Sequence, residues 1–294
     1  MSYQFYIVDV FAEQSYSGNQ LAVVIGERLP SEDSMQKIAA EMNFSETTFV
    51  TPEPEENGGY RVRIFTPSKE IAFAGHPILG TAQVLRNHVI SESSAHIKLN
   101  LSESQVPVTF EISDAGKEIV WFSAPEMLLG AISAVEPVAT ALGISSDDIE
   151  MRTPIQVVSA GTSAMIIPLR SLDALRKCML NIEKYSSMLA NGFPPLTYLF
   201  TQQTYNSEND LCVRFFFESH GVREDPATGN GAAFLGAYLL EHQYFPESGL
   251  SLRIEQGYEV RRPSLIMLRA KMLAGIREVY VGGYVVSVVE GKLL

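Results

Sequence analysis

Short runs of strand-forming residues predict β-strands in the first part of the chain. Residues 4–11 and 21–25 are rich in β-branched and aromatic side chains, and Ser17-Gly18-Asn19 between them is typical of a turn. Residues 47–51 and 60–65 return to strand chemistry, and in the second of these segments arginines alternate with valine and isoleucine. These segments indicate a sheet.

Helical periodicity interrupts the strands. A helix that opens near residues 30–33 is predicted to have one apolar face, formed by Met35, Ile38, Ala39 and Met42. A second helix, with Pro77 at its first helical position, is apolar on nearly all sides and is therefore predicted to be buried. Further strands are expected at 95–101, 106–112, 118–122 and 279–289, and the last of them could pair with either half of the chain. Mixed strands with one buried helix per half favour an α+β fold over alternating βαβ units.

Several motifs recur about half a chain length apart, which predicts two similar halves. The recurring pairs are Val62-Arg63-Ile64-Phe65 with Val213-Arg214-Phe215-Phe216, Ala74-Gly75-His76 with Thr228-Gly229-Asn230, and, more weakly, residues 6–10 with 155–159. The predicted halves are residues 1–127 with the C-terminal strand 279–294, and residues 128–278.

Composition narrows the possible partners of this chain. Among 294 residues, 34 acidic and 22 basic side chains give a net charge of −12, which disfavours nucleic acid as a partner. No apolar run is long enough to span a membrane, and the first residues do not have the pattern of a signal peptide, so a cytoplasmic location is expected. The two cysteines cannot build a disulfide framework or a four-thiolate metal site.

Two glycine-containing helix starts are candidate binding sites. At Gly75-His76-Pro77 and Gly229-Asn230-Gly231, free backbone N–H groups and the positive end of a helix dipole would favour an anion such as a carboxylate. If the halves face each other, both starts would converge on one pocket. The alternative is that these glycines only cap helices and allow close packing. A dinucleotide site is not expected, because Phe234 stands where the third glycine of G-x-G-x-x-G belongs.

Three side chains are candidates for acid–base chemistry. His76 lies in the first turn of its helix and is a candidate acid, base or substrate donor. Asp225 precedes the second glycine turn, where it could equally form an Asx-type turn before proline. Glu46 lies among apolar and β-branched neighbours, where loss of water would raise the pKa of its carboxyl group and make it a stronger base. The alternative is a solvated glutamate in a loop. The histidine spacing and the few cysteines predict no metal site.

Six motifs together resemble the PhzF-like phenazine-biosynthesis isomerase family. They are Gly18–Val24, Met35–Ala39, Ser45–Phe49, Arg63–Pro67, Phe73–Ala82 and Glu224–Gly229. The resemblance implies the diaminopimelate-epimerase-like fold, in which two similar halves each wrap a mixed sheet around a central helix and the site lies between them. It also implies a homodimer that uses neither a metal nor an organic cofactor.

The resemblance also assigns site residues. The family's catalytic glutamate, histidine and aspartate fall on Glu46, His76 and Asp225. The substrate would be bound by Ser45, Gly75, Gly229, Asn230 and Gly231. Asn230 replaces the serine of the phenazine enzymes, so the resemblance leaves the substrate open. The same fold hosts racemases with a cysteine in each half, but Cys178 and Cys212 do not occupy the glycine turns.

The resulting hypothesis is an isomerase that moves a proton between carbons of a small carboxylate-bearing molecule, with Glu46 as the general base. An amino-acid racemase or epimerase is one alternative. A family member that binds a metabolite or a protein without chemistry is the other.

Overall fold

The computed structural model describes residues 3–90, 94–114, 116–190, 192–216 and 224–294. The chain divides into two compact units, one made of Met1–Ser123 with Val281–Leu294 and the other of Ala124–Tyr280. We call them unit 1 and unit 2. No helix in the described ranges is both long and apolar enough to cross a membrane.

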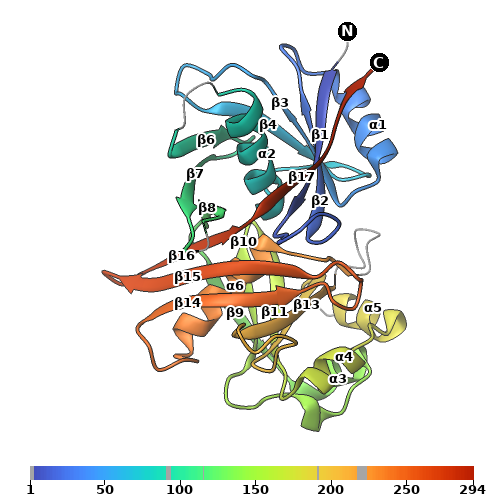
Figure 1. Ribbon diagram of the computed structural model, residues 1–294. Helices are drawn as coiled ribbons and strands as arrows, with labels where there is room; N and C mark the ends of the chain where they lie inside the picture. The colour runs from blue at the N-terminus through green and yellow to red at the C-terminus, as the bar shows by residue number, and fades with distance from the viewer. Residues whose placement is uncertain (1–2, 91–93, 115, 191, 217–223) are drawn as a thin grey trace. The chain divides into compact units, whose positions relative to one another are not determined.

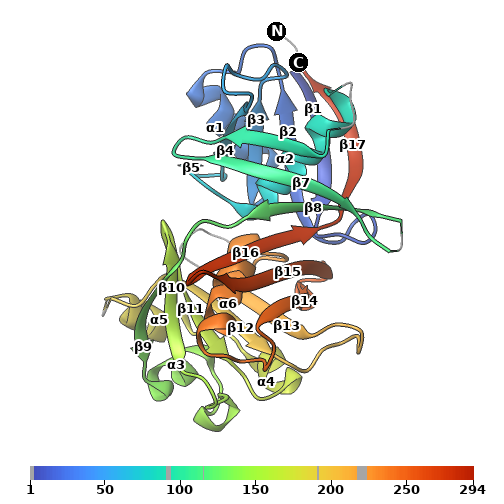
Figure 2. The same ribbon diagram turned by 90° about the vertical axis from the view of Figure 1, so that its left-hand side faces the viewer.

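Unit 1 is a mixed sheet wrapped around the buried helix α2 (Figures 1 and 2). Its strands are β1 (Tyr3–Val10), β2 (Asn19–Ile25), β3 (Glu46–Val50), β4 (Tyr60–Phe65), β5 (Glu70–Ile71), β6 (His96–Asn100), β7 (Gln105–Ile112), β8 (Glu118–Ser123) and β17 (Val285–Leu293). Its helices are α1 (Glu32–Met42) and α2 (Gly75–His88). The first eleven residues of α2 are all buried, as the nearly all-round apolar pattern predicts. At Gly80 the helix lies so close to the sheet that a Cβ atom would be 2.5 Å from Leu21.

Unit 2 repeats this plan around the buried helix α6 (Gly229–Glu241), which packs against β10, β11, β14 and β15 (Figure 2). Its strands are β9 (Leu128–Ser133), β10 (Ile155–Ala160), β11 (Thr162–Pro168), β12 (Leu196–Thr201), β13 (Leu211–Phe216), β14 (Gly249–Gln256), β15 (Ser264–Leu273) and most of β16 (Ile276–Gly283). Its other helices are α3 (Val135–Leu142), the 3₁₀ turn η1 (Ser146–Asp148), α4 (Leu172–Lys177) and α5 (Ile182–Ala190).

The strand pairings follow the same order in both units. From β17 through β1, β2, β3, β4 and β6 to β7, the successive pairs are antiparallel, antiparallel, parallel, antiparallel, parallel and antiparallel. From β9 through β10, β11, β12, β13 and β14 to β15, the order is identical. Each central helix is the crossover of a parallel pair, β4 to β6 or β13 to β14. The predicted α+β fold with two similar halves is therefore confirmed.

Two sequence predictions were wrong in detail. Helix α2 begins at Gly75, so Pro77 is its third residue and not its first. The backbone already turns from extended to helical after Ala74, and a proline is tolerated anywhere in the first turn because the N–H groups there have no intrahelical acceptor. The strand predicted at 279–289 is two strands, β16 and β17, which are separated at Tyr284.

Candidate active site

Glu46 and His76 meet in unit 1, at the end of the sheet where α2 begins. Glu46 is the first residue of β3, and the parallel register pairs it with Leu21, close to the start of β2. His76 is the second residue of α2. Nε2 of His76 lies 3.2 Å from Oε2 of Glu46, and their side chains are only 5% and 13% exposed. Glu46 is therefore not the solvated loop residue of the alternative reading.

The contact between His76 and Glu46 involves a neutral imidazole. Burial lowers the pKa of His76 to about 3, although a hydrogen bond with the Gln20 backbone acts in the opposite direction. Nε2 has no hydrogen-bond partner of good geometry in the described part of the chain. The pair is thus a close approach of a neutral ring to a carboxyl group.

Asn19 joins this pair and was not selected from the sequence as a site residue. Its Nδ2 atom lies 3.3 Å from Nδ1 of His76, and its side chain is almost fully buried at the start of β2. The adjoining Gly18 has φ +66°, and a Cβ atom there would lie 2.3 Å from the Val10 carbonyl oxygen, so the tight turn requires glycine. The turn signal in the sequence marked this position, but it did not indicate a contact with His76.

Helix α2 also presents an uncapped N-terminus. Its cap residue, Ala74, has no side chain that can accept hydrogen bonds from the first turn. The backbone N–H groups of Gly75 and His76 belong to this turn, whose donors lack intrahelical acceptors. Ser45, directly before β3, is partly exposed. These groups and the helix dipole are suited to a bound carboxylate.

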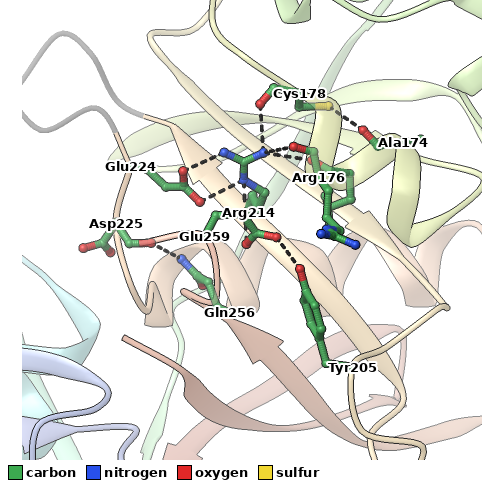
Figure 3. Close-up of polar contacts among 10 residues, drawn as sticks. Ala174, Arg176, Cys178, Tyr205, Arg214, Glu224, Asp225, Gln256 and Glu259 are labelled. Carbon is green, nitrogen blue, oxygen red and sulfur yellow. Dashed lines mark hydrogen bonds and ion pairs between the residues drawn. The ribbon is translucent and has the colours of Figure 1, made fainter. Parts of the chain in front are cut away.

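Asp225 and Asn230 lie in unit 2, at the corresponding start of α6. Oδ2 of Asp225 accepts a hydrogen bond of 2.6 Å from the Thr228 hydroxyl. The backbone carbonyl oxygen of Asp225 accepts one of 2.8 Å from Gln256 Nε2 (Figure 3). Asp225 is 5% exposed. Gln256 also accepts a hydrogen bond of 3.0 Å from the Thr228 backbone N–H. Gln256 thus holds the turn through hydrogen bonds to Asp225 and Thr228. The sequence did not identify it, because it lies far along the chain and belongs to no motif.

The first turn of α6 is closely packed on one side and polar on the other. Gly229 and Gly231 are buried, and a Cβ atom on Gly231 would lie 2.4 Å from the Tyr198 ring. Asn230 is partly exposed, and its Oδ1 atom has no hydrogen-bond partner among the described residues. The N-cap residue of α6, Thr228, makes no side-chain capping hydrogen bond to the first turn. Asn230 and the backbone N–H groups are thus available to a polar ligand.

Neither cysteine belongs to a glycine turn, because Cys178 follows α4 and Cys212 lies on β13. Cys178 and Cys212 are free and buried. Burial raises the pKa of Cys178 to about 12 and raises the pKa of Cys212 further. Such thiols are not poised to exchange protons, which disfavours a racemase that uses one cysteine in each half. Within the described ranges, no group of three or more His, Cys, Asp or Glu side chains is arranged to hold a metal ion.

Comparison with known proteins gives a consistent relationship over the whole chain. Residues 8–291 match the family of phenazine biosynthesis-like proteins. The chain is 34% identical to an uncharacterised isomerase of Pasteurella multocida, over 99% of this chain and 94% of the relative. It is 32% identical to trans-2,3-dihydro-3-hydroxyanthranilate isomerase of Pseudomonas chlororaphis, over 92% and 91%. A Bacillus anthracis PhzF-family crystal structure is 24% identical and superposes with a TM-score of 0.91, covering 100% of this chain and 99% of the other.

Proposed function

We propose that this chain, which is an isomerase of the phenazine biosynthesis-like family, transfers a proton between two carbon atoms of a small carboxylate-bearing substrate. The proposed reaction uses neither a metal nor an organic cofactor. The observation that supports this most directly is the Glu46–His76 pair at the uncapped start of α2. It combines a mostly buried carboxyl group with donors for an anion.

Glu46 is the proposed general base. It removes a proton from carbon and returns it, or a proton exchanged with solvent, to another carbon of the conjugated system. The neutral His76 lies 3.2 Å from Glu46 and adds no positive charge beside it. The N–H groups of Gly75 and His76 stabilise the charge that develops on the substrate as the proton leaves.

Asp225 is the third proposed catalytic residue, and Asn230 a proposed substrate-binding residue. The hydrogen bonds from Thr228 and Gln256 fix the side chain and backbone of Asp225, so it can orient a polar group of the substrate without rearranging. The amide of Asn230 can both donate and accept hydrogen bonds and so suits a carboxylate, hydroxyl or amine neighbour.

Deuterium incorporation tests the proposal. The protein is incubated in D₂O with trans-2,3-dihydro-3-hydroxyanthranilate and a panel of cyclic and amino-acid carboxylates, and carbon-bound deuterium is measured by mass spectrometry. We expect incorporation with at least one compound and a loss of about 10²- to 10⁴-fold in Glu46→Gln, the usual effect of losing a general base. Glu41→Gln, an exposed change on α1, is the matched control and should retain the wild-type rate.

Two results would contradict the proposal. Full activity in Glu46→Gln would remove Glu46 as the base. No incorporation with any compound would refute proton transfer at carbon for this substrate class. If exchange occurs, the stereochemistry and bond positions of the product separate an isomerase that moves a double bond from an epimerase that inverts one carbon.

A further inference from the structure

The arginine of each repeated Val-Arg motif forms an ion pair with the segment that leads into a central helix. Arg63 lies on β4 and Arg214 on β13, which occupy the same place in the two pairing orders. Arg63 binds Glu70, which precedes α2, and Arg214 binds Glu224, which precedes α6. The interval from Glu70 to the first residue of α2 equals the interval from Glu224 to the first residue of α6.

Arg214 uses all three guanidinium nitrogens. Its Nε and Nη2 atoms donate hydrogen bonds of 2.9 and 2.7 Å to the two carboxylate oxygens of Glu224 (Figure 3). Its Nη1 atom donates to the carbonyl oxygens of Leu175, Arg176 and Cys178 at 2.9, 3.3 and 2.8 Å, at the end of α4. The side chains of Arg214 and Glu224 are 7% and 9% exposed, so a planar, two-point ion pair is held in a nearly water-free setting.

This ion pair fixes the backbone next to the proposed catalytic aspartate. Asp225 follows Glu224 directly, and its N–H donates a hydrogen bond of 3.0 Å to the carbonyl of Phe215, the neighbour of Arg214. Its own carbonyl is held by Gln256. Asp225 is thus attached to β13 on one side and to β14 on the other before the chain enters α6.

The equivalent pair in unit 1 is more open to water. Arg63 donates hydrogen bonds of 2.7 and 2.5 Å to Glu70 and one of 2.9 Å to Glu32, the first residue of α1. The side chains of Arg63 and Glu70 are 21% and 32% exposed, so solvent screens this pair more strongly. Loss of the ion pair in unit 2 should therefore have the larger effect on the local structure.

We propose that Arg214 and Glu224 are positioning residues that hold Asp225 in its catalytic geometry, an inference that rests on the proposed function for the role of Asp225. The pair does not touch the substrate. It fixes the backbone at Glu224, so that the Asp225 carboxylate keeps its hydrogen bond with Thr228 and its direction at the start of α6.

Glu224→Gln is the primary test, because it removes the charge while keeping the size of the side chain. Its matched control is Glu241→Gln, at the other end of the same helix, which breaks the 2.5 Å ion pair with Arg277. We measure kcat and KM on a compound for which the wild type incorporates deuterium. We also measure amide hydrogen exchange of a peptide that covers residues 224–232.

The expected result in Glu224→Gln is a fall in kcat of about tenfold or more, since small displacements of catalytic groups are costly, with KM changed less than about twofold. Amide exchange across 224–232 should accelerate. Glu241→Gln should change neither quantity. Arg214→Lys should reproduce the effect, because an ammonium group cannot make the two-point contact. If Arg214→Lys does not fold, Glu224→Gln alone decides.

Unchanged amide exchange in Glu224→Gln would overturn the inference, and so would faster exchange with an unchanged kcat. An equal fall in kcat in Glu241→Gln would show a general effect of losing an ion pair and would also overturn it. If the wild type is inactive on every compound, the proposed function fails, and the exchange measurement still tests whether the pair anchors this segment.

Discussion

Replacing Gly231 with alanine should destabilise unit 2 through a contact at the first turn of α6. The new Cβ atom would lie 2.4 and 2.5 Å from Cε2 and Cδ2 of Tyr198. The Tyr198 ring is fully buried and packs edge-on against Phe215 at a centroid distance of 5.8 Å, so it has little room to move. Overpacking of this kind costs about 1–3 kcal/mol.

The backbone effect of the same change is of opposite sign. Alanine is favoured over glycine within a helix by roughly 0.5–1 kcal/mol, so the centres of the two ranges give a net loss of about 1 kcal/mol for Gly231→Ala. For a unit of this size that corresponds to a fall in melting temperature of about 2–4 °C. Gly236→Ala, in the same helix, is the control: its Cβ would lie 3.0 Å from a terminal methyl of Leu268, which can give way more easily.

A double-mutant cycle tests whether the ring is the cause. Chemical denaturation of Gly231→Ala, Tyr198→Leu and the double variant gives the coupling free energy. If the contact is responsible, the smaller leucine should recover most of the loss caused by Gly231→Ala, and the two changes will not be additive. Additive losses, or a Gly231→Ala variant as stable as the wild type, would refute this reasoning.

Three further outcomes follow from buried groups. Tyr198→Phe should leave stability unchanged or raise it by up to about 1 kcal/mol in chemical denaturation, because the hydroxyl has no hydrogen-bond partner among the described residues, and a clear loss would contradict this. Because burial lowers the pKa of His76 to about 3, the unfolded state binds a proton that the folded state does not between that value and the ordinary pKa near 6.5. The contribution of neutral His76 to the stability of the fold is therefore complete above pH 6.5. As the pH falls below that value, the folding equilibrium constant decreases by up to about tenfold per pH unit. His76→Gln should flatten this pH dependence in denaturation curves measured from pH 7 to 4.5. Cys178 and Cys212 should resist iodoacetamide in the native protein and react only in denaturant, and labelling without unfolding, followed by mass spectrometry, would show that they are accessible.

Local patterns predicted the elements of this fold well but not the ends that depend on tertiary partners. Strand β4 has the predicted bounds because its alternation is a property of the segment alone. The last strand was misread because β17 pairs with β1, at the other end of the chain, and β16 precedes a break that periodicity does not record. The first turn of α2 was shifted for a similar reason, since Gly75 and His76 are helical in a packed environment that their own propensities do not predict.

The candidate site was accessible from the sequence only in part. The residues of the glycine turns were identified by their chemistry, and the proximity of Glu46 to His76 follows from the parallel register of β2 and β3. No spacing in the sequence reveals that register. Gln256 could not be identified for the same reason. A lone glutamine on a strand can bind the Asp225 carbonyl only when β14 lies beside the turn that contains Asp225.

The pairing of β17 with β1 has a consequence for the synthesis of this protein. Unit 1 is started first, but its sheet lacks a neighbour for one side of β1 until residues 285–293 emerge, after all of unit 2. At about 5–20 residues per second, the roughly 160 residues in between take on the order of ten to thirty seconds to translate. During that interval β1 is an open sheet edge, which is prone to pair with another chain. Unit 1 is therefore begun first and completed last, since its final strand follows the end of unit 2 at Tyr280.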